Sequence, residues 1–238
     1  MSVNYNEALE NFLKSLNISI FGVADLSLYN LEENPPIFKS HFVKYKYGIS
    51  IAIRLSDNTI DSIDSKPTPA YADHYREINR KLDFLSEKIK KWIEENGFLS
   101  YAVLASKIID EENLKGELSH KTIARLAGIG WQGKSLLIIN PYYGPRFRLA
   151  TILTDMPLVP NKPLKNYCGN CDICKNACPS AAIKGLKVEE YYKSREEAIF
   201  LERCYKKLLA FKELDGINAT VCGICIKVCP WGKTYDKK

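Results

Sequence analysis

The chain has 238 residues, of which 46% are hydrophobic and 26% are charged, and its formal net charge at pH 7 is +6. This composition is typical of a globular protein and excludes disordered, collagen-like and coiled-coil chains. It contains no run of about 18 apolar residues, so we expect no membrane association through a spanning helix. The first residues lack the basic start and apolar core of a signal peptide, which favours a cytoplasmic protein. We also expect a monomer.

The first 155 residues alternate between helical and strand-like patterns. Apolar residues recur at helical spacing in three segments, which are residues 6–16, 71–96 and 120–127. Shorter apolar runs predict strands at residues 18–26, 49–53, 99–105, 135–140 and 147–153. Helices and strands in this alternation indicate an α/β or α+β body.

Cysteine and charge are both concentrated in the last third of the chain. All eight cysteines lie between Cys168 and Cys229, and residues 156–238 carry the whole net charge of +6. The positive excess either offsets negatively charged clusters or attracts an anionic partner. Prolines at positions 157, 160 and 163 mark a boundary. We therefore predict two domains, with a metal domain at residues 157–238.

The first cysteine run is Cys168-Gly-Asn-Cys171-Asp-Ile-Cys174-Lys-Asn-Ala-Cys178-Pro179. Its spacing is that of the bacterial ferredoxin run, in which three cysteines bind one 4Fe-4S cluster and the fourth binds the other. Three thiolates on one tight loop can reach three corners of a cluster. The amides of such a loop can offset the negative charge of the cluster.

The second run, Cys222-Gly-Ile-Cys225-Ile-Lys-Val-Cys229-Pro230, matches the first from its second cysteine onward, and Cys204 is left to supply the missing ligand. The sequence therefore predicts two 4Fe-4S clusters. The expected ligands of the first are Cys168, Cys171, Cys174 and Cys229, and those of the second are Cys178, Cys204, Cys222 and Cys225. Zinc and disulfides are the alternatives, but zinc sites seldom carry the full run that ends in Cys-Pro.

A two-cluster ferredoxin needs little chain beyond its cluster loops, yet 167 residues precede Cys168. This length predicts an enzyme whose clusters feed a reaction centre in the N-terminal domain. Arg146 and Arg148 alternate along a predicted strand and could bind a carboxylate or phosphate, with a solvated strand face as the alternative. We expect Lys206 and Lys207 on a solvated helix face, with a nucleic-acid contact as the alternative.

The stretch from His120 to Ser135, which reads His-Lys-Thr-Ile-Ala-Arg-Leu-Ala-Gly-Ile-Gly-Trp-Gln-Gly-Lys-Ser, resembles the epoxyqueuosine reductases. Tyr143-Gly144, residues 151–155 and the two cysteine runs ending at Cys-Pro-Trp231 add to the resemblance. It implies a nitroreductase-like domain at residues 1–156 and a bacterial ferredoxin-like domain at residues 157–238. Reductive dehalogenases share the same core.

The resemblance also implies a reaction in queuosine biosynthesis. Clusters would reduce cobalamin to cob(I)alamin, which removes a leaving group reductively from a tRNA nucleoside or a small substrate. An electron donor of the ferredoxin or flavodoxin type and tRNA are the implied partners. The family members with a longer chain add a helical-repeat domain that helps to hold tRNA, and this chain stops soon after its second cysteine run, which favours a smaller substrate.

Two sets of residues are implied for this reaction. Glycine-rich turns can bring backbone amides close to a cofactor, and the candidate cobalamin-binding residues are Gly128, Gly130, Trp131, Gly133, Lys134 and Ser135. A tight turn with a solvated Lys134 is the alternative. The family's acidic proton donor lies upstream of this segment, where this chain has Glu117 and, nearby, His120. Both are candidate catalytic residues, and His120 could instead only start a helix.

Two other functions remain open. The N-terminal domain could bind FMN, which would make the protein a flavin/iron–sulfur reductase. Alternatively, the chain could be an electron-transfer or activator protein for a partner corrinoid protein.

Overall fold

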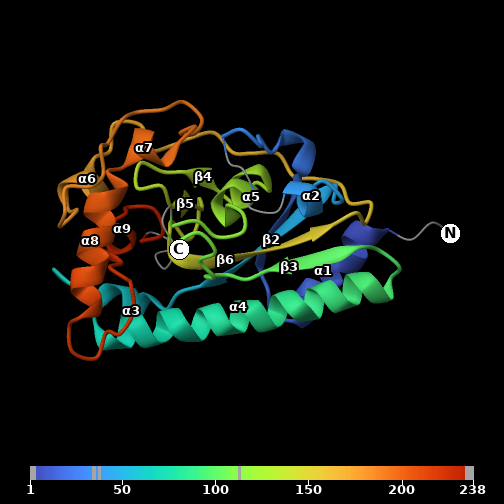
Figure 1. Ribbon diagram of the computed structural model, residues 1–238, viewed down its shortest axis with the longest axis horizontal. Helices are drawn as coiled ribbons and strands as arrows, with labels where there is room; N and C mark the ends of the chain where they lie inside the picture. The colour runs from blue at the N-terminus through green and yellow to red at the C-terminus, as the bar shows by residue number, and fades with distance from the viewer. Residues whose placement is uncertain (1–3, 34–35, 37–38, 112–113, 234–238) are drawn as a thin grey trace. The chain divides into compact units, whose positions relative to one another are not determined.

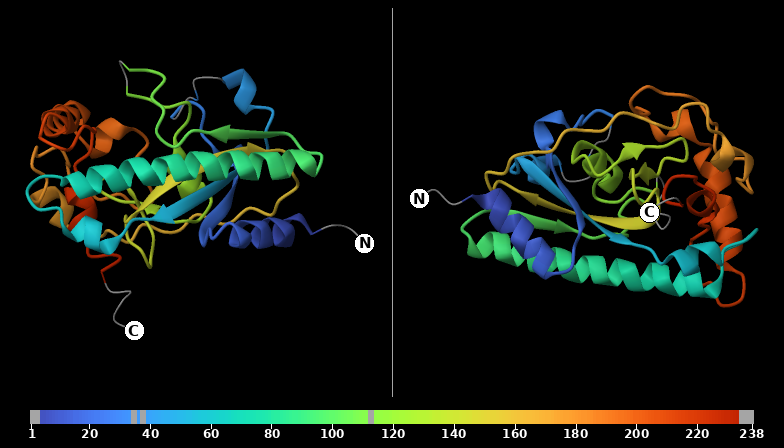
Figure 2. Two further views of the ribbon diagram at one scale, coloured as in Figure 1. Left: turned by 90° about the horizontal axis from the view of Figure 1, so that it is seen from below. Right: turned by 180° about the vertical axis from the view of Figure 1, so that it is seen from behind.

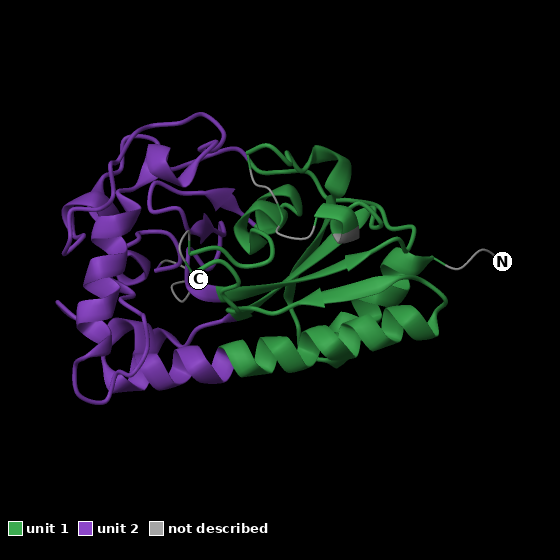
Figure 3. Cartoon of the chain, viewed as in Figure 1, with its two compact units in different colours: residues 1–53, 79–129, 148–164 green, residues 54–78, 130–147, 165–238 purple. Residues whose placement is uncertain are grey.

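The computed structural model describes residues 4–33, 36, 39–111 and 114–233. The chain forms two compact units, each built from three segments (Figure 3). The first unit comprises residues 1–53, 79–129 and 148–164, and the second comprises residues 54–78, 130–147 and 165–238. The sequence suggested one boundary after residue 156, whereas two earlier segments join the cysteine-bearing unit. Within the described residues, no helix has both the length and the apolar character needed to cross a membrane.

The first unit is organised around a four-stranded sheet with the order β1-β2-β6-β3. β1 (Ile20–Asp25) pairs antiparallel with β2 (Tyr47–Arg54). β3 (Ser100–Val103) pairs antiparallel with β6 (Phe147–Thr154). Most residues of β1, β2 and β6 are buried, which explains why these strands read in the sequence as continuous apolar runs.

Helices cover both faces of this sheet (Figures 1 and 2). On one face lie α1 (Tyr5–Ser15) and residues 79–95 of α4 (Pro69–Glu95), and Phe12 stacks on Trp92 with ring centroids 4.9 Å apart. On the other face lies α5 (His120–Leu126). A Cβ atom at Gly22 of β1 would lie 2.1 Å from the carbonyl oxygen of Ala127, so only glycine allows this close approach.

The second unit consists of short elements joined by loops. They are α3 (Asp57–Asp61), the start of α4, the β4 (Trp131–Gln132) and β5 (Ile138–Ile139) pair, α6 (Ile173–Asn176), α7 (Arg195–Ala198), α8 (Leu201–Lys212) and α9 (Ile224–Lys227). The short helices α6 and α9 contact each other, and each carries a cysteine from one of the two runs. The remaining short segments of the first unit are η1 (Leu26–Leu28) and α2 (Lys39–Phe42).

The predicted elements of residues 1–155 are observed with small shifts, and a mixed α/β architecture is confirmed. The exception is the predicted strand over residues 135–140. Only Ile138 and Ile139 are in strand conformation, and they pair with β4, a two-residue strand too short to give a periodic pattern. The nitroreductase-like character of the first unit stays a prediction.

Charged side chains connect the three segments of the second unit. The guanidinium of Arg146 is buried and lies 2.8 Å from a carboxylate oxygen of Asp57 and 2.8 Å from one of Asp61. Lys227 donates to the carbonyl of Ile63, and Arg76 donates to the carbonyl of Ile217 at 2.8 Å. The solvated strand face considered for Arg146 is therefore wrong. Its guanidinium does bind carboxylates, and these belong to Asp57 and Asp61 of the same unit.

Candidate metal centre

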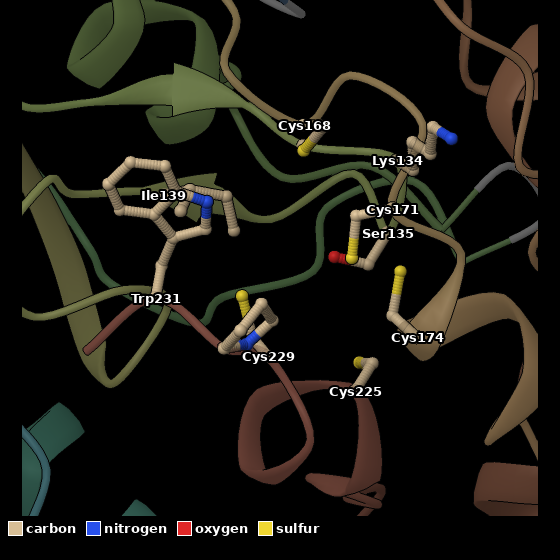
Figure 4. A pocket seen from close by; sticks show the side chains of 11 residues that line it. Lys134, Ser135, Ile139, Cys168, Cys171, Cys174, Cys225, Cys229 and Trp231 are labelled. Atoms are coloured by element: carbon tan, nitrogen blue, oxygen red, sulfur yellow. The ribbon is translucent and has the colours of Figure 1, made fainter. Parts of the chain in front are cut away.

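Five cysteines of the second unit line a hollow of about 370 Å³, a volume that includes the part open to solvent, and four of them belong to one group. Figure 4 shows the thiols of Cys168, Cys171, Cys174 and Cys229 around this space. The charges of Cys168 and Cys171 raise the pKa of the Cys174 thiol. Cys168, Cys171 and Cys174 likewise raise the pKa of the Cys229 thiol, so the four residues lie close together. These are the four cysteines that the spacing assigns to one cluster.

The other four cysteines form a second group. Cys204 and Cys178 act electrostatically on Cys222, and all three act on Cys225. Cys225 is also influenced by Cys174 and lines the hollow of the first group, so the two groups are neighbours. All eight cysteines are free and partly buried. Within the described part of the chain, no three His, Cys, Asp or Glu side chains form a group that could hold a single metal ion.

Burial favours the protonated form of four of these thiols when no metal is bound. Burial and, after it, the neighbouring cysteines raise the pKa of Cys174 to about 11 and that of Cys229 to about 12. Burial also raises the pKa values of Cys222 and Cys225. A bound metal cluster must displace these protons, and its iron must supply the positive charge that the buried thiolates otherwise lack.

Cys178 has the opposite tendency. Burial raises the pKa of its thiol, but hydrogen bonds from the Ser180 hydroxyl and from nearby backbone amides outweigh this effect and lower the pKa. The N–H of Ala182 donates to the Cys178 sulfur at 3.3 Å. The chain therefore stabilises the thiolate of this residue before any metal is present.

The two cysteine runs differ in the residue that follows the first of their matched cysteines. Gly223 follows Cys222 with φ +78°, and a Cβ there would lie 2.4 Å from Ile63 and 2.8 Å from Tyr71, so the close packing requires glycine. The matched residue of the first run is Asp172, which has ordinary backbone angles.

Asp172 forms an ion pair with a buried lysine in the wall of the hollow. Lys134 is only 5% exposed, and its Nζ donates to the Asp172 carboxylate at 2.7 Å. This hydrogen bond holds the pKa of Asp172 below its usual value. Gly133, Lys134 and Ser135 line the hollow, and a Cβ at Gly133 would lie 3.4 Å from the Cys168 sulfur. The solvated lysine considered from the sequence is wrong.

The other candidate cobalamin-binding residues are packed inside the protein. Trp131 is fully buried and contacts Tyr167 and Trp231 edge-on, with ring centroids 5.3 and 4.8 Å away. A Cβ at Gly130 would lie 2.3 Å from the Ile139 carbonyl oxygen, and one at Gly128 would lie 2.6 Å from that of Lys162. These glycines allow close backbone packing and present no open cradle. Gly128, Gly130 and Trp131 therefore do not fit a corrin ring.

Trp131 has one further feature. Its Nε1–H is buried and has no hydrogen-bond partner among the described residues. Its neighbour Trp231 lines the hollow of the first cysteine group. A buried donor without a partner is costly unless a bound group satisfies it, and the sulfur atoms of a cluster are acceptors of this kind.

His120 starts α5 directly after the N-cap residue Ser119. Its Nδ1 lies 2.9 Å from the Thr151 hydroxyl, and its Nε2 lies 3.0 Å from the Leu104 carbonyl oxygen. The carbonyl can only accept, so Nε2 carries the proton and Nδ1 accepts from Thr151. Burial lowers the pKa of His120 to about 4, against the opposing effect of the Leu104 hydrogen bond. The ring is thus neutral at pH 7, which favours a structural role.

Glu117, the other candidate proton donor, is half-buried in the first unit. The Tyr101 hydroxyl donates a hydrogen bond to its carboxylate. Burial, and after it this hydrogen bond, raise the pKa of Tyr101 to about 12, so the hydroxyl remains protonated. Sequence reasoning did not identify the Tyr101 contact, because the two residues lie 16 positions apart in the chain.

Comparison with known proteins assigns the cysteine region. Residues 167–232 match the family described as the 4Fe-4S double cluster binding domain. An epoxyqueuosine reductase of Listeria monocytogenes is 35% identical over 126 residues, which are 51% of this chain and 31% of that protein. An epoxyqueuosine reductase of Bacillus subtilis is 30% identical over 166 residues, which are 69% of this chain and 39% of that protein. The resemblance to epoxyqueuosine reductases is confirmed, and the chain spans less than half the length of these relatives.

Solved structures show the same fold. An epoxyqueuosine reductase crystallised with a modified tRNA stem loop has a TM-score of 0.61 at 22% identity, covering 96% of this chain and 65% of that one. A catabolic reductive dehalogenase in complex with 3-bromo-4-hydroxybenzoic acid has a TM-score of 0.72 at 18% identity, covering 95% and 32%. At these identities the likeness extends to the fold.

The neutral state of His120 predicts a pH-dependent stability. The pKa of His120 in the folded protein, about 4, lies below the ordinary value of 6.5. Its contribution to the free energy of unfolding is therefore complete above pH 6.5 and is lost as the pH falls toward 4. The loss is about 1.4 kcal/mol per pH unit. Chemical denaturation at pH 7, 6 and 5 should show a stability advantage over His120→Gln that shrinks with falling pH. A constant difference between the two proteins would contradict this assignment.

Proposed function

We propose that this protein is an iron–sulfur reductase of the epoxyqueuosine reductase type that binds two 4Fe-4S clusters. The observation that carries the proposal is the gathering of eight free cysteines into two neighbouring groups of four. The match to a double-cluster domain and the similarity to curated reductases support it. In this proposal Cys168, Cys171, Cys174 and Cys229 bind the first cluster. Cys178, Cys204, Cys222 and Cys225 bind the second.

Residues around the cysteines favour cluster binding at the two sites. When bound, such clusters supply one-electron transfer. The hydrogen bonds that lower the pKa of Cys178 favour its thiolate form, which is the form that binds iron. The Lys134–Asp172 ion pair fixes the loop that carries Cys171 and Cys174 against residues 130–147. It also prevents the Asp172 carboxylate from adding an uncompensated negative charge beside an anionic cluster.

Cobalamin belongs to the proposal as the electron acceptor, on the basis of similarity. A solved reductive dehalogenase with a TM-score of 0.72 is described as carrying out B12-dependent dehalogenation. Gly133, Lys134 and Ser135, which the sequence suggested for cobalamin, line the hollow of the first cysteine group, so no catalytic step is assigned to this cofactor. FMN remains the alternative acceptor.

A tRNA nucleoside or a smaller molecule is the proposed substrate. The tRNA assignment draws support from the related reductase that was crystallised with a modified tRNA stem loop. We propose Glu117, rather than His120, as the proton donor to the departing group. The neutral imidazole of His120 uses both ring nitrogens in hydrogen bonds to the protein, whereas the Glu117 carboxyl group has two oxygen atoms and accepts a hydrogen bond from the Tyr101 hydroxyl.

Iron content tests the cluster assignment. Anaerobic reconstitution with iron and sulfide should give about eight iron atoms per chain, because each cluster holds four. Cys229→Ser and Cys178→Ser should each reduce the content to about four, since each removes a ligand of a different cluster. Ser135→Ala is the matched control, because Ser135 lines the hollow without supplying a thiolate, and it should keep all the iron. Far fewer than eight irons in the unaltered chain would refute the proposal.

The Lys134–Asp172 pair should set the reduction potential of the first cluster. Lys134→Gln removes a positive charge and should make the potential more negative, whereas Asp172→Asn should make it more positive. Titration followed by electron paramagnetic resonance can measure both shifts. A purely structural pair would instead give shifts of the same sign, or loss of iron, in both variants.

A substrate assay tests the finer assignment. The reconstituted protein, supplied with cobalamin and a chemical reductant, should reduce the epoxyqueuosine of a modified tRNA stem loop. Glu117→Gln should lower this rate at least about 100-fold with unchanged iron content, because general acid catalysis contributes about 10²–10⁴. Turnover with FMN in place of cobalamin would favour the flavin alternative. Absence of turnover with either cofactor would overturn the tRNA assignment.

A further inference from the structure

Phe200 is an exposed aromatic residue at the start of α8, and two cationic side chains surround it. Its side chain is 42% exposed. The ammonium of Lys184 lies 4.6 Å from the ring centroid, and the guanidinium of Arg203 lies 4.2 Å from it. Aromatic residues and arginine are both enriched at protein–protein interfaces. The proposed function leaves this feature unexplained.

The backbone of Phe200 connects this surface directly to the second cysteine group. The carbonyl of Phe200 accepts a hydrogen bond from the N–H of Cys204 at 3.2 Å. Its N–H donates to the carbonyl of Ala182 at 2.8 Å, and the N–H of Ala182 donates to the Cys178 sulfur at 3.3 Å. An exposed residue is therefore one or two hydrogen bonds away from two proposed ligands of the second cluster.

Positive charge predominates along the same helix. Residues 200–212 contain four cationic side chains and one acidic side chain. Lys206 is 73% exposed and pairs with Glu202 one turn earlier, and Lys207 lies 5.1 Å from the Phe211 ring centroid. Such a surface attracts an acidic protein and increases the rate at which the two associate.

We propose that the surface formed by Lys184, Phe200, Arg203 and Lys206 is the docking site of a small acidic electron-carrier protein that reduces the second cluster. The inference rests on the proposed function, since it requires that cluster. One electron leaves the reduced carrier and converts the cluster from the 2+ to the 1+ state, and no bond forms or breaks. Electron-transfer complexes of this kind bury little surface and depend on charge.

A nucleic acid is the competing anionic partner, and the geometry favours the carrier over it. Single-stranded nucleic acids bind to exposed aromatic rings through base stacking. Here the Lys184 and Arg203 cations lie 4.6 and 4.2 Å from the Phe200 ring centroid, so a base would have to displace a cation in order to stack on the ring. The hydrogen-bonded path to Cys178 and Cys204 has a direct use in electron entry but none in nucleic-acid binding.

Anaerobic stopped-flow reduction by a purified, fully reduced flavodoxin tests the proposal. At low ionic strength, Arg203→Glu and Lys206→Glu should each lower the second-order rate constant for reduction about tenfold. The effect should disappear at high salt, because screening removes the attraction between exposed charges. Lys206 is exposed and remote from any core contact, so its variant keeps the test valid if Arg203→Glu folds poorly.

Lys91→Glu is the matched control. Lys91 is 78% exposed and, like Lys206, pairs with a glutamate one helical turn away, but it lies on the part of α4 in the first unit. It should change the rate less than twofold. Reduction by a photoreduced deazaflavin, a small molecule that needs no docking surface, should be equal in all four proteins.

Each result has a distinct meaning. Missing iron in the unaltered protein would refute the proposed function itself, before any docking is measured. Intact clusters with flavodoxin rates that are equal in Lys206→Glu and Lys91→Glu would overturn the docking site. Weaker binding of a tRNA stem loop by Lys206→Glu, with unchanged flavodoxin kinetics, would overturn it as well and assign the surface to nucleic acid.

Discussion

The need to neutralise eight closely spaced sulfur atoms governs the structure of the second unit. Burial and mutual repulsion raise the pKa values of Cys174 and Cys229, so the thiols resist ionisation until a cation replaces their protons. Nearby groups reduce this cost locally, as the amides and hydroxyl around Cys178 do. The net positive charge of residues 156–238 also offsets the negative charge of the sulfur atoms. Folding of this unit and metal binding are therefore linked.

The spacing of residues along the chain predicted the parts of the molecule that are formed by residues close together in the sequence. The two cysteine runs each form one tight loop and a short helix, so a fixed interval of residues translates into a fixed geometry. The long helix α4 was equally visible, because its apolar face repeats over many turns. Partners that are distant in sequence were not predictable. Asp57 and Asp61 bind Arg146 across more than 80 residues, and nothing in the local pattern indicates this.

The glycine-rich segment shows how a pattern can be correct and its interpretation incomplete. Glycines at positions 130 and 133 do allow a close approach, as expected, but the group that approaches is the protein's own chain. A solvated Lys134 was the alternative interpretation, but this residue is buried because Asp172, 38 residues later, supplies its counter-charge. The same segment therefore serves the iron–sulfur site, and the position of any second cofactor must be found from other residues.

The interleaving of the two units limits how this protein can be divided. A fragment that began at residue 157 would contain every cysteine but would lack Lys134, Arg146 and the aspartates that Arg146 binds. Gene fragments that encode only the cysteine-rich end would therefore yield an incomplete metal module. An evolutionary exchange of this module for another could not proceed by simple recombination at a single crossover point.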